Sequence, residues 1–146
     1  MGLELQRNSD WTLWRGDNLL GTYGSEQAFL NAGTVWLIGS KQKLRVRLEA
    51  LGLEAETKRS WRVAADGRQA RSDDALNDFA LRNLGFQVRY RYEFAPLSYL
   101  YLVYVRGGSL FDAGAGPYAV SEASGGAFDL RDSEQLLVKL SYRFEI

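Results

Sequence analysis

The sequence predicts an all-β fold, and three observations carry this prediction. Short stretches rich in Tyr, Phe, Val and Leu alternate with polar residues at a period of two, which is typical of β-strands. The 146 residues contain fifteen glycines but only two prolines. No stretch with the helical period extends over more than about two turns. The length is that of one domain, and 46% hydrophobic residues are enough to bury an apolar surface.

Three segments show the alternation most clearly, and each is predicted to be a strand with one apolar and one charged face. In residues 134–146 the apolar positions are Leu136, Val138, Leu140, Tyr142, Phe144 and Ile146, and the opposite positions include Lys139, Arg143 and Glu145. In residues 83–94 they are Leu84, Phe86, Val88, Tyr90, Tyr92 and Phe94, opposite Gln87, Arg89, Arg91 and Glu93. In residues 44–50 they are Leu44, Val46, Leu48 and Ala50, opposite Arg45, Arg47 and Glu49.

The remaining strands have weaker patterns. Residues 26–38 form a further candidate, and residues 2–7 another. Residues 99–106 are apolar on both faces, so the period leaves the orientation of this strand open. Beyond Ala50 the apolar positions change phase, which predicts a bulge near Gly52. We therefore expect an antiparallel up-and-down meander of about six long strands.

The connections between these strands alternate in length. Residues 39–43 and 95–98 are short turns, whereas residues 8–25, 56–78 and 107–133 are long, polar segments. Every second connection is thus short, and all the short turns are expected at one end of the sheet. Transmembrane barrels have this asymmetry between their two rims.

Alternation alone fits two architectures, a soluble barrel with its apolar side inward and a membrane barrel with its apolar side toward lipid. Strand length favours the membrane, because thirteen residues such as 134–146, at ~3.3 Å each and tilted by ~45°, span roughly 30 Å. Aromatic residues near the short turns suggest an interfacial girdle. The predicted lipid-facing or girdle residues are Trp36, Phe86, Tyr90, Tyr92, Phe94, Leu140, Tyr142 and Phe144. The predicted lumen-facing residues are Arg45, Arg47, Glu49, Gln87, Arg89, Arg91, Glu93, Lys139, Arg143 and Glu145.

Composition excludes several classes of function. Eighteen basic and eighteen acidic residues give a net charge of zero, so no nucleic-acid partner is expected. The chain has neither Cys nor His, which removes thiol and imidazole catalysis and the usual zinc sites. We assign no catalytic residue, cofactor or metal, and expect the protein not to be an enzyme. Its longest apolar run, residues 99–105, is too short for a membrane helix, and residues 1–10 lack the features of a signal peptide.

Four segments resemble a known family. RYRYEFAPLSYLYLVYVRGG (89–108), NSDWTLWRGDNLLGTY (8–23), KLRVRLEALGLEAE (43–56) and LLVKLSYRFEI (136–146) are similar to the carboxy-terminal region of the domain-of-unknown-function 5916 family. Its members look like outer-membrane β-barrels of Gram-negative bacteria. The resemblance implies a longer parent with a signal peptide and an amino-terminal carbohydrate-binding domain, both absent here. Tyr142, Phe144 and Ile146 also look like the terminal signal that such barrels present to their assembly machinery.

Residues 1–146 are accordingly expected to be a single segment of a larger barrel, incomplete by itself because one-chain bacterial barrels need at least eight strands. The expected partners are the lipid bilayer, the barrel-assembly machinery, and either the remaining strands of the parent barrel or copies of this chain. The expected location is the cell outer membrane. Its function would be solute passage or surface binding, with carbohydrate implied by the resemblance alone. The alternative is a soluble β-barrel or clamshell module that binds a small molecule.

Overall fold

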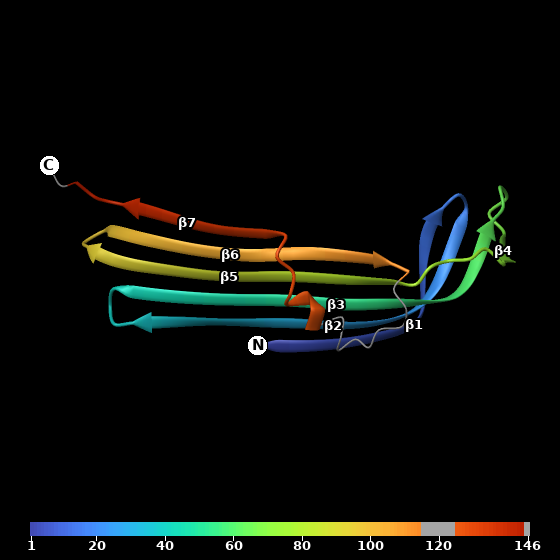
Figure 1. Cartoon of the computed structure of the whole chain (residues 1–146), viewed down its shortest axis with the longest axis horizontal. Coiled ribbons are helices and arrows are strands. Elements are labelled where there is room, and N and C mark those ends of the chain that lie inside the picture. The colour runs from blue at the N-terminus through green and yellow to red at the C-terminus, as the bar shows by residue number, and fades with distance from the viewer. Residues whose placement is uncertain (115–124, 145–146) are drawn as a thin grey trace.

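The fold is a single antiparallel β-sheet, as the alternation predicts. The computed structural model describes residues 1–114 and 125–144. The strands are β1 (Gly2–Gly16), β2 (Leu19–Ile38), β3 (Gln42–Val63), β4 (Gln69–Ser72), β5 (Phe79–Ala95), β6 (Ser98–Ala113) and β7 (Ser133–Ser141). Their order in the sheet is β1-β2-β3-β5-β6-β7, with the short β4 paired to the end of β3 (Figure 1). The sheet is an up-and-down meander of seven strands that does not close into a barrel.

The first connection differs from the expectation. Residues 8–25 were expected to be a long loop, but β1 and β2 continue through them and meet at a two-residue turn. Asp17 and Asn18 occupy this turn with φ values of 48° and 58°, directly after Gly16 at 95°. Positive φ at both central residues is the conformation that matches the twist of a hairpin, and Asp and Asn tolerate it well. The expected segregation of short and long connections therefore fails at this corner.

At the loop end, opposite the turns at 39–41 and 96–97, the strands of the first half leave the plane of the sheet. Figure 1 shows the ends of β1, β2 and β3 turning away from the plane and carrying β4 with them. The register shifts between Asn8 and Trp11 on β1 and between Thr22 and Tyr23 on β2 lie in this region. Bulges bend a strand and increase its twist, which accounts for the change of direction.

The bulge expected near Gly52 is absent. Pairing between β3 and β5 runs without interruption from Gln42 opposite Tyr92 to Ala55 opposite Phe79. Gly52 itself lies between Ala28 of β2 and Arg82 of β5 in a regular row. The change of phase in the sequence is therefore a true exchange of polarity between the two faces of one continuous sheet.

The register defines these faces. We call them the Leu48 face and the Arg89 face, after two residues that the pairing places on opposite sides. In the half nearer the turns, the Leu48 face is apolar and the Arg89 face is charged. Beyond Ala50 and Leu84 the Leu48 face carries charges, whereas the Arg89 face carries a hydrophobic cluster of Tyr23, Ala55 and Phe79.

The sheet is one layer thick over most of its area. The chain exposes 9904 Å², whereas a compact monomer of 16.5 kDa exposes roughly 7,500 Å². Within the described residues the buried hydrophobic side chains are Tyr23, Ala28, Ala50, Ala55, Phe79, Ala80, Leu84 and Ala127. Ala127 and Leu130, which precede β7, cover the Leu48 face only around Ala50 and Leu84. The rest of that face has no protein layer over it in the described part of the chain.

Candidate functional site

Most of the predicted lumen-facing residues lie on one face. The pairing places these eight on the Arg89 face: Arg45, Arg47, Glu49, Gln87, Arg89, Arg91, Glu93 and Lys139. Arg143 follows the end of β7, where its backbone N–H donates to the Ser98 hydroxyl at 3.1 Å. Glu145 lies outside the described residues. The register of the sheet places these residues on one face. That this face lines a lumen remains a prediction.

The predicted lipid-facing residues divide into two groups. The register places Trp36, Phe86, Tyr90, Tyr92 and Leu140 on the Leu48 face. Phe94, Tyr142 and Phe144 form a chain of rings at the turn end, with centroid distances of 6.2 Å and 4.8 Å between successive rings. Because β7 ends at Ser141, the strand expected to continue to residue 146 is shorter than predicted. Ile146 lies outside the described residues.

A single bulge decides the orientation of β6, which the sequence left open. Ala95 pairs with Ser98, but the next pair is Glu93 with Tyr99, so Phe94 is an extra residue on β5. A shift of one residue sends every side chain of the following strand to the other face. The bulge thereby places Tyr99, Tyr101, Val103 and Val105 on the Arg89 face, beside the arginines.

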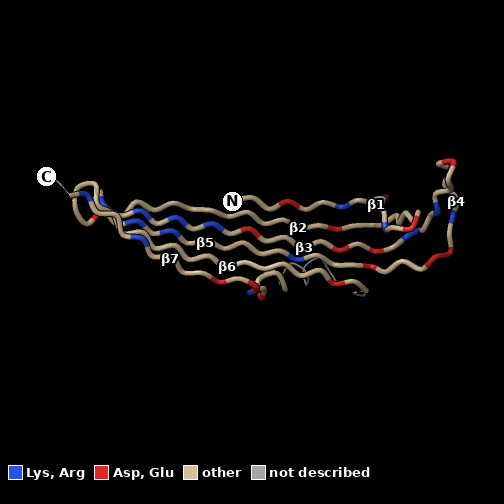
Figure 2. Tube along the Cα trace, turned by 90° about the horizontal axis from the view of Figure 1, so that it is seen from above, with Lys and Arg blue, Asp and Glu red and all other residues tan. Residues whose placement is uncertain are grey.

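The strongest concentration of charge lies on the Arg89 face near the turns. Lys43 stands opposite Arg91, and Arg45 stands opposite Arg89. Figure 2 shows Lys and Arg gathered toward this end of the sheet. An open groove of about 410 Å³ passes over the cluster, and its lining is Lys43, Arg45, Arg89, Tyr90, Arg91, Tyr101, Val103, Val105, Gln135 and Leu137. The predicted site residues include four of these, Arg45, Arg89, Tyr90 and Arg91, but not the other six. Lys43 borders a turn, and the orientation of the β6 residues Tyr101, Val103 and Val105 depends on the β5 bulge, which local alternation does not reveal. Gln135 and Leu137 are uncharged residues of β7, so the charge pattern did not single them out.

Neighbouring groups neutralise only part of this charge. Glu49 accepts from Arg47 at 2.5 Å and from the Asn31 side-chain amide at 3.3 Å. Arg47 and Glu49 therefore neutralise each other. Arg91 lies over the ring of Tyr99, 5.2 Å from its centroid. Glu93 accepts the backbone N–H of Leu97 at the turn. These contacts leave a group of cations without a carboxylate partner within the described residues.

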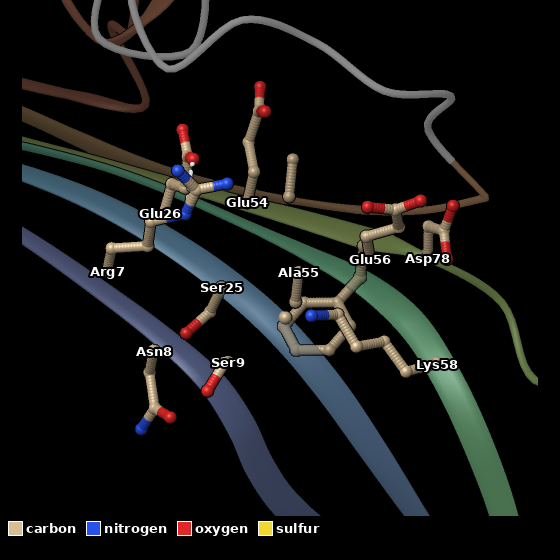
Figure 3. Close-up of a pocket in the computed structure, with 13 residues that line it drawn as sticks. Arg7, Asn8, Ser9, Ser25, Glu26, Glu54, Ala55, Glu56, Lys58 and Asp78 are labelled. Carbon is tan, nitrogen blue, oxygen red and sulfur yellow. Dashed lines mark ion pairs between the residues drawn. The ribbon is translucent and has the colours of Figure 1, made fainter.

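A second concavity lies at the loop end, where carboxylates gather. It has a volume of about 460 Å³, and its lining includes Arg7, Glu26, Glu54, Glu56, Lys58 and Asp78. Figure 3 shows the ion pair between Arg7 and Glu26, in which Arg7 Nε lies 3.1 Å from Glu26 Oε1. Asp78 accepts the backbone N–H of Thr57 at 2.6 Å and so fastens the residues before β5 to β3. This contact assigns Asp78 a structural role.

The hairpin that contains β4 is held by a carboxylate. Asp74 accepts from the Arg62 guanidinium at 2.6 Å and from the Ser72 hydroxyl at 2.5 Å. These two hydrogen bonds, the Arg62 bond being the stronger influence, hold the pKa of Asp74 below its usual value. These hydrogen bonds have a local effect, because they join only the ends of β3 and β4.

Three tryptophans at the loop end, Trp11, Trp14 and Trp61, have different surroundings. Trp11 packs against the buried cluster, with its ring centroid 6.0 Å from that of Phe79. Trp61 donates its indole N–H to the Thr22 hydroxyl at 3.1 Å. Trp14 is exposed. The three rings do not form one platform in these contacts.

Comparison with protein-family models, curated proteins and solved structures finds no match. The resemblance to the domain-of-unknown-function 5916 family therefore stays a prediction that rests on the quoted segments. Over the described residues, no helix is long and apolar enough to span a membrane. Nor do the described acidic residues assemble a group of three or more suited to hold a metal ion.

Proposed function

We propose that this chain is the carboxy-terminal portion of a Gram-negative outer-membrane β-barrel that serves solute passage or surface binding. The Leu48 face contacts lipid in this proposal, and the Arg89 face lines a wet interior. The link to carbohydrate use comes from the family resemblance alone.

The observation that carries the proposal is that the half of the Leu48 face nearer the turns carries no charged residue. We call this half the charge-free zone. Its border toward the loop end, marked by the first charged residue on each strand, is slanted across the sheet. On β1, β2 and β3 the first charged residues beyond the zone are Arg7, Glu26 and Glu54, which lie in one row. On β5 the first charge is Arg82, two residues nearer the turns. On β6 and β7 the first charges are Arg106 and Glu134, paired with each other and a further four residues nearer the turns.

The slant has the size that a barrel requires. The border moves by six residues across the five spacings from β1 to β7. At ~3.3 Å per residue and ~4.8 Å between strands, this is a slope of about 40°. Strands of outer-membrane barrels tilt by ~35–45°, so a flat membrane border crosses their rows at this angle.

Exposure and open edges add support. Apolar side chains on this face are exposed, among them Leu136 at 71%, Val138 at 62% and Leu140 at 67%. In the described sheet β1 pairs only with β2 and β7 only with β6. Unpaired edges are unstable in lipid, so further strands from a parent chain or from copies must complete the barrel.

Two adjacent residues of β7 provide a matched test. Val138 lies on the Leu48 face and Leu137 on the Arg89 face, and they are 62% and 56% exposed. Because the chain has no cysteine, Val138→Cys and Leu137→Cys each create one labelling site. Each variant is labelled with an environment-sensitive fluorophore and incorporated into phosphatidylcholine vesicles. We expect spin-labelled acyl chains to quench the label at 138 and aqueous iodide to quench the label at 137.

The proposal is wrong if the chain remains a monomer in buffer without entering vesicles. It is also wrong if iodide quenches both labels equally. A label at 138 that is shielded from both quenchers in a soluble chain indicates the alternative, a soluble barrel with the Leu48 face inside.

A further inference from the structure

The basic cluster on the Arg89 face raises the question of what balances its charge. Lys43 and Arg91 form one cross-strand pair, and Arg45 and Arg89 form the next pair on the same face. Directly opposite side chains of antiparallel strands have Cβ atoms about 5 Å apart, and like charges there destabilise the sheet. Two such pairs that are neighbours on one face therefore need a compensating feature.

The surrounding protein does not provide the compensation in the described residues. Arg45 and Arg89 are exposed and form no ion pair with a described residue. The nearest carboxylates on this face, Glu49 and Glu93, already accept from Arg47 and from the Leu97 N–H respectively. Arg91 has an aromatic partner in Tyr99, which holds its guanidinium near the sheet without neutralising it.

The groove over the cluster has the form of a ligand site. Its volume of about 410 Å³ falls within the range of small-molecule pockets, ~300–1,000 Å³. The β6 side of the groove is formed by Tyr101, Val103 and Val105, and β7 adds Gln135 and Leu137. Arginine guanidinium groups match the geometry of phosphate, sulfate and carboxylate, and apolar walls contact the framework that carries such groups.

We propose that Lys43, Arg45, Arg89 and Arg91 form a binding site for a small polyanion. The ligand carries two or more phosphate, sulfate or carboxylate groups on a sugar or hydrocarbon framework. The cations contact its oxyanions, and the framework lies against Tyr101, Val103 and Leu137. This site depends on β3, β5, β6 and β7 and does not depend on whether the Leu48 face contacts lipid.

The test is calorimetric titration of the full chain with sodium tripolyphosphate, in a non-ionic detergent or in buffer if the chain is soluble without it. Arg45→Gln with Arg89→Gln is expected to weaken binding at least tenfold. Arg59→Gln with Arg71→Gln removes the same charge from exposed residues at the loop end and is expected to change binding less than threefold. Arg45→Lys with Arg89→Lys retains the charge and is expected to recover most of the affinity.

The site is excluded if the wild-type chain shows no saturable binding up to millimolar concentration. It is also excluded if the two glutamine double variants lose equal affinity, because the attraction is then a diffuse field. Titration with trigalacturonate and competition with vesicles of phosphatidylcholine and phosphatidylglycerol identify the source of the oxyanions. A soluble probe that binds and resists the vesicles indicates a solute, whereas displacement by anionic vesicles indicates a lipid headgroup.

Discussion

The ring of Tyr23 meets the ring of Phe79 edge to face, with centroids 5.3 Å apart and planes inclined by 71°. Tyr23 comes from β2 and Phe79 from the start of β5, on either side of β3 in the sheet. With Ala55 between them, these rings form the buried cluster at the loop end. The contact joins strands that do not pair directly, and it lies where the first strands begin to leave the plane.

Removal of this ring should destabilise the fold. Tyr23 is fully buried, so Tyr23→Ala is expected to lower the free energy of unfolding by about 3–5 kcal/mol, the usual range for large aromatic truncations. Urea denaturation followed by tryptophan fluorescence measures the change. Tyr23→Phe keeps the ring and serves as the control, with a change below about 1.5 kcal/mol. Equal losses in the two variants contradict a packing role for the ring.

A charge placed on the Leu48 face tests the lipid contact energetically. Leu140 lies in the charge-free zone, and Ser141 is its neighbour on the opposite face. Leu140→Arg is expected to destabilise the chain folded in phosphatidylcholine vesicles by about 2–4 kcal/mol, the penalty for arginine near the bilayer midplane. Ser141→Arg is expected to change stability by less than about 0.5 kcal/mol. Guanidinium titration of both variants makes the comparison, and equal stability contradicts the assignment of the faces.

The close approach of the segment before β7 to β6 depends on a glycine. A Cβ added to Gly108 would lie 2.9 Å from Asp132 Oδ2 and 2.9 Å from Leu130 Cβ. Asp132 accepts the backbone N–H of Ser109 at 2.7 Å, and this bond would have to shift. Gly108→Ala is therefore expected to cost about 1–3 kcal/mol and to accelerate hydrogen exchange at Ser109.

Gly85 offers the control for this substitution. An added Cβ there meets no heavy atom within 4 Å. Gly85→Ala should leave both the free energy of unfolding and the Ser109 exchange rate near their wild-type values. Similar acceleration in both variants would show that the effect is general to glycine replacement in the sheet.

The Asp74 carboxylate predicts a pH dependence at the β4 hairpin. Because the folded state holds the pKa of Asp74 below its unfolded value, its contribution to stability is present above the unfolded value, about 3.8. This contribution is lost as the pH falls through the lower, folded-state pKa. The amide signal of Asp74, which donates to the Ser72 hydroxyl, is expected to move in an NMR titration only below about pH 4. Asp74→Asn should abolish the transition, whereas Asp73→Asn should leave it unchanged.

Local alternation was enough to predict the strands whose two faces differ strongly. Residues 44–50 and 83–94 lie on β3 and β5, and their apolar and charged positions separate between the two faces as predicted. The hairpin at Asp17 and Asn18 was missed although its signal is present, since Asp and Asn favour the positive φ of a tight hairpin turn. The bulge near Gly52 was wrongly expected, because a change of phase in the sequence has the same form whether the backbone shifts or the environment changes.

The sequence alone determined the fold class and the two faces of the strongly alternating strands, with arginines on one face and leucines on the other. It could do so because, in a strand, the position of a residue is enough to assign its side chain to one face. The tertiary structure decided which strands share those faces. The clearest example is β6, whose side chains are apolar on both sides and whose orientation follows from one extra residue at Phe94. That bulge brings Tyr101 beside Arg91, a contact between strands that no local pattern encodes, because register depends on the geometry of the turn and on the partner strand.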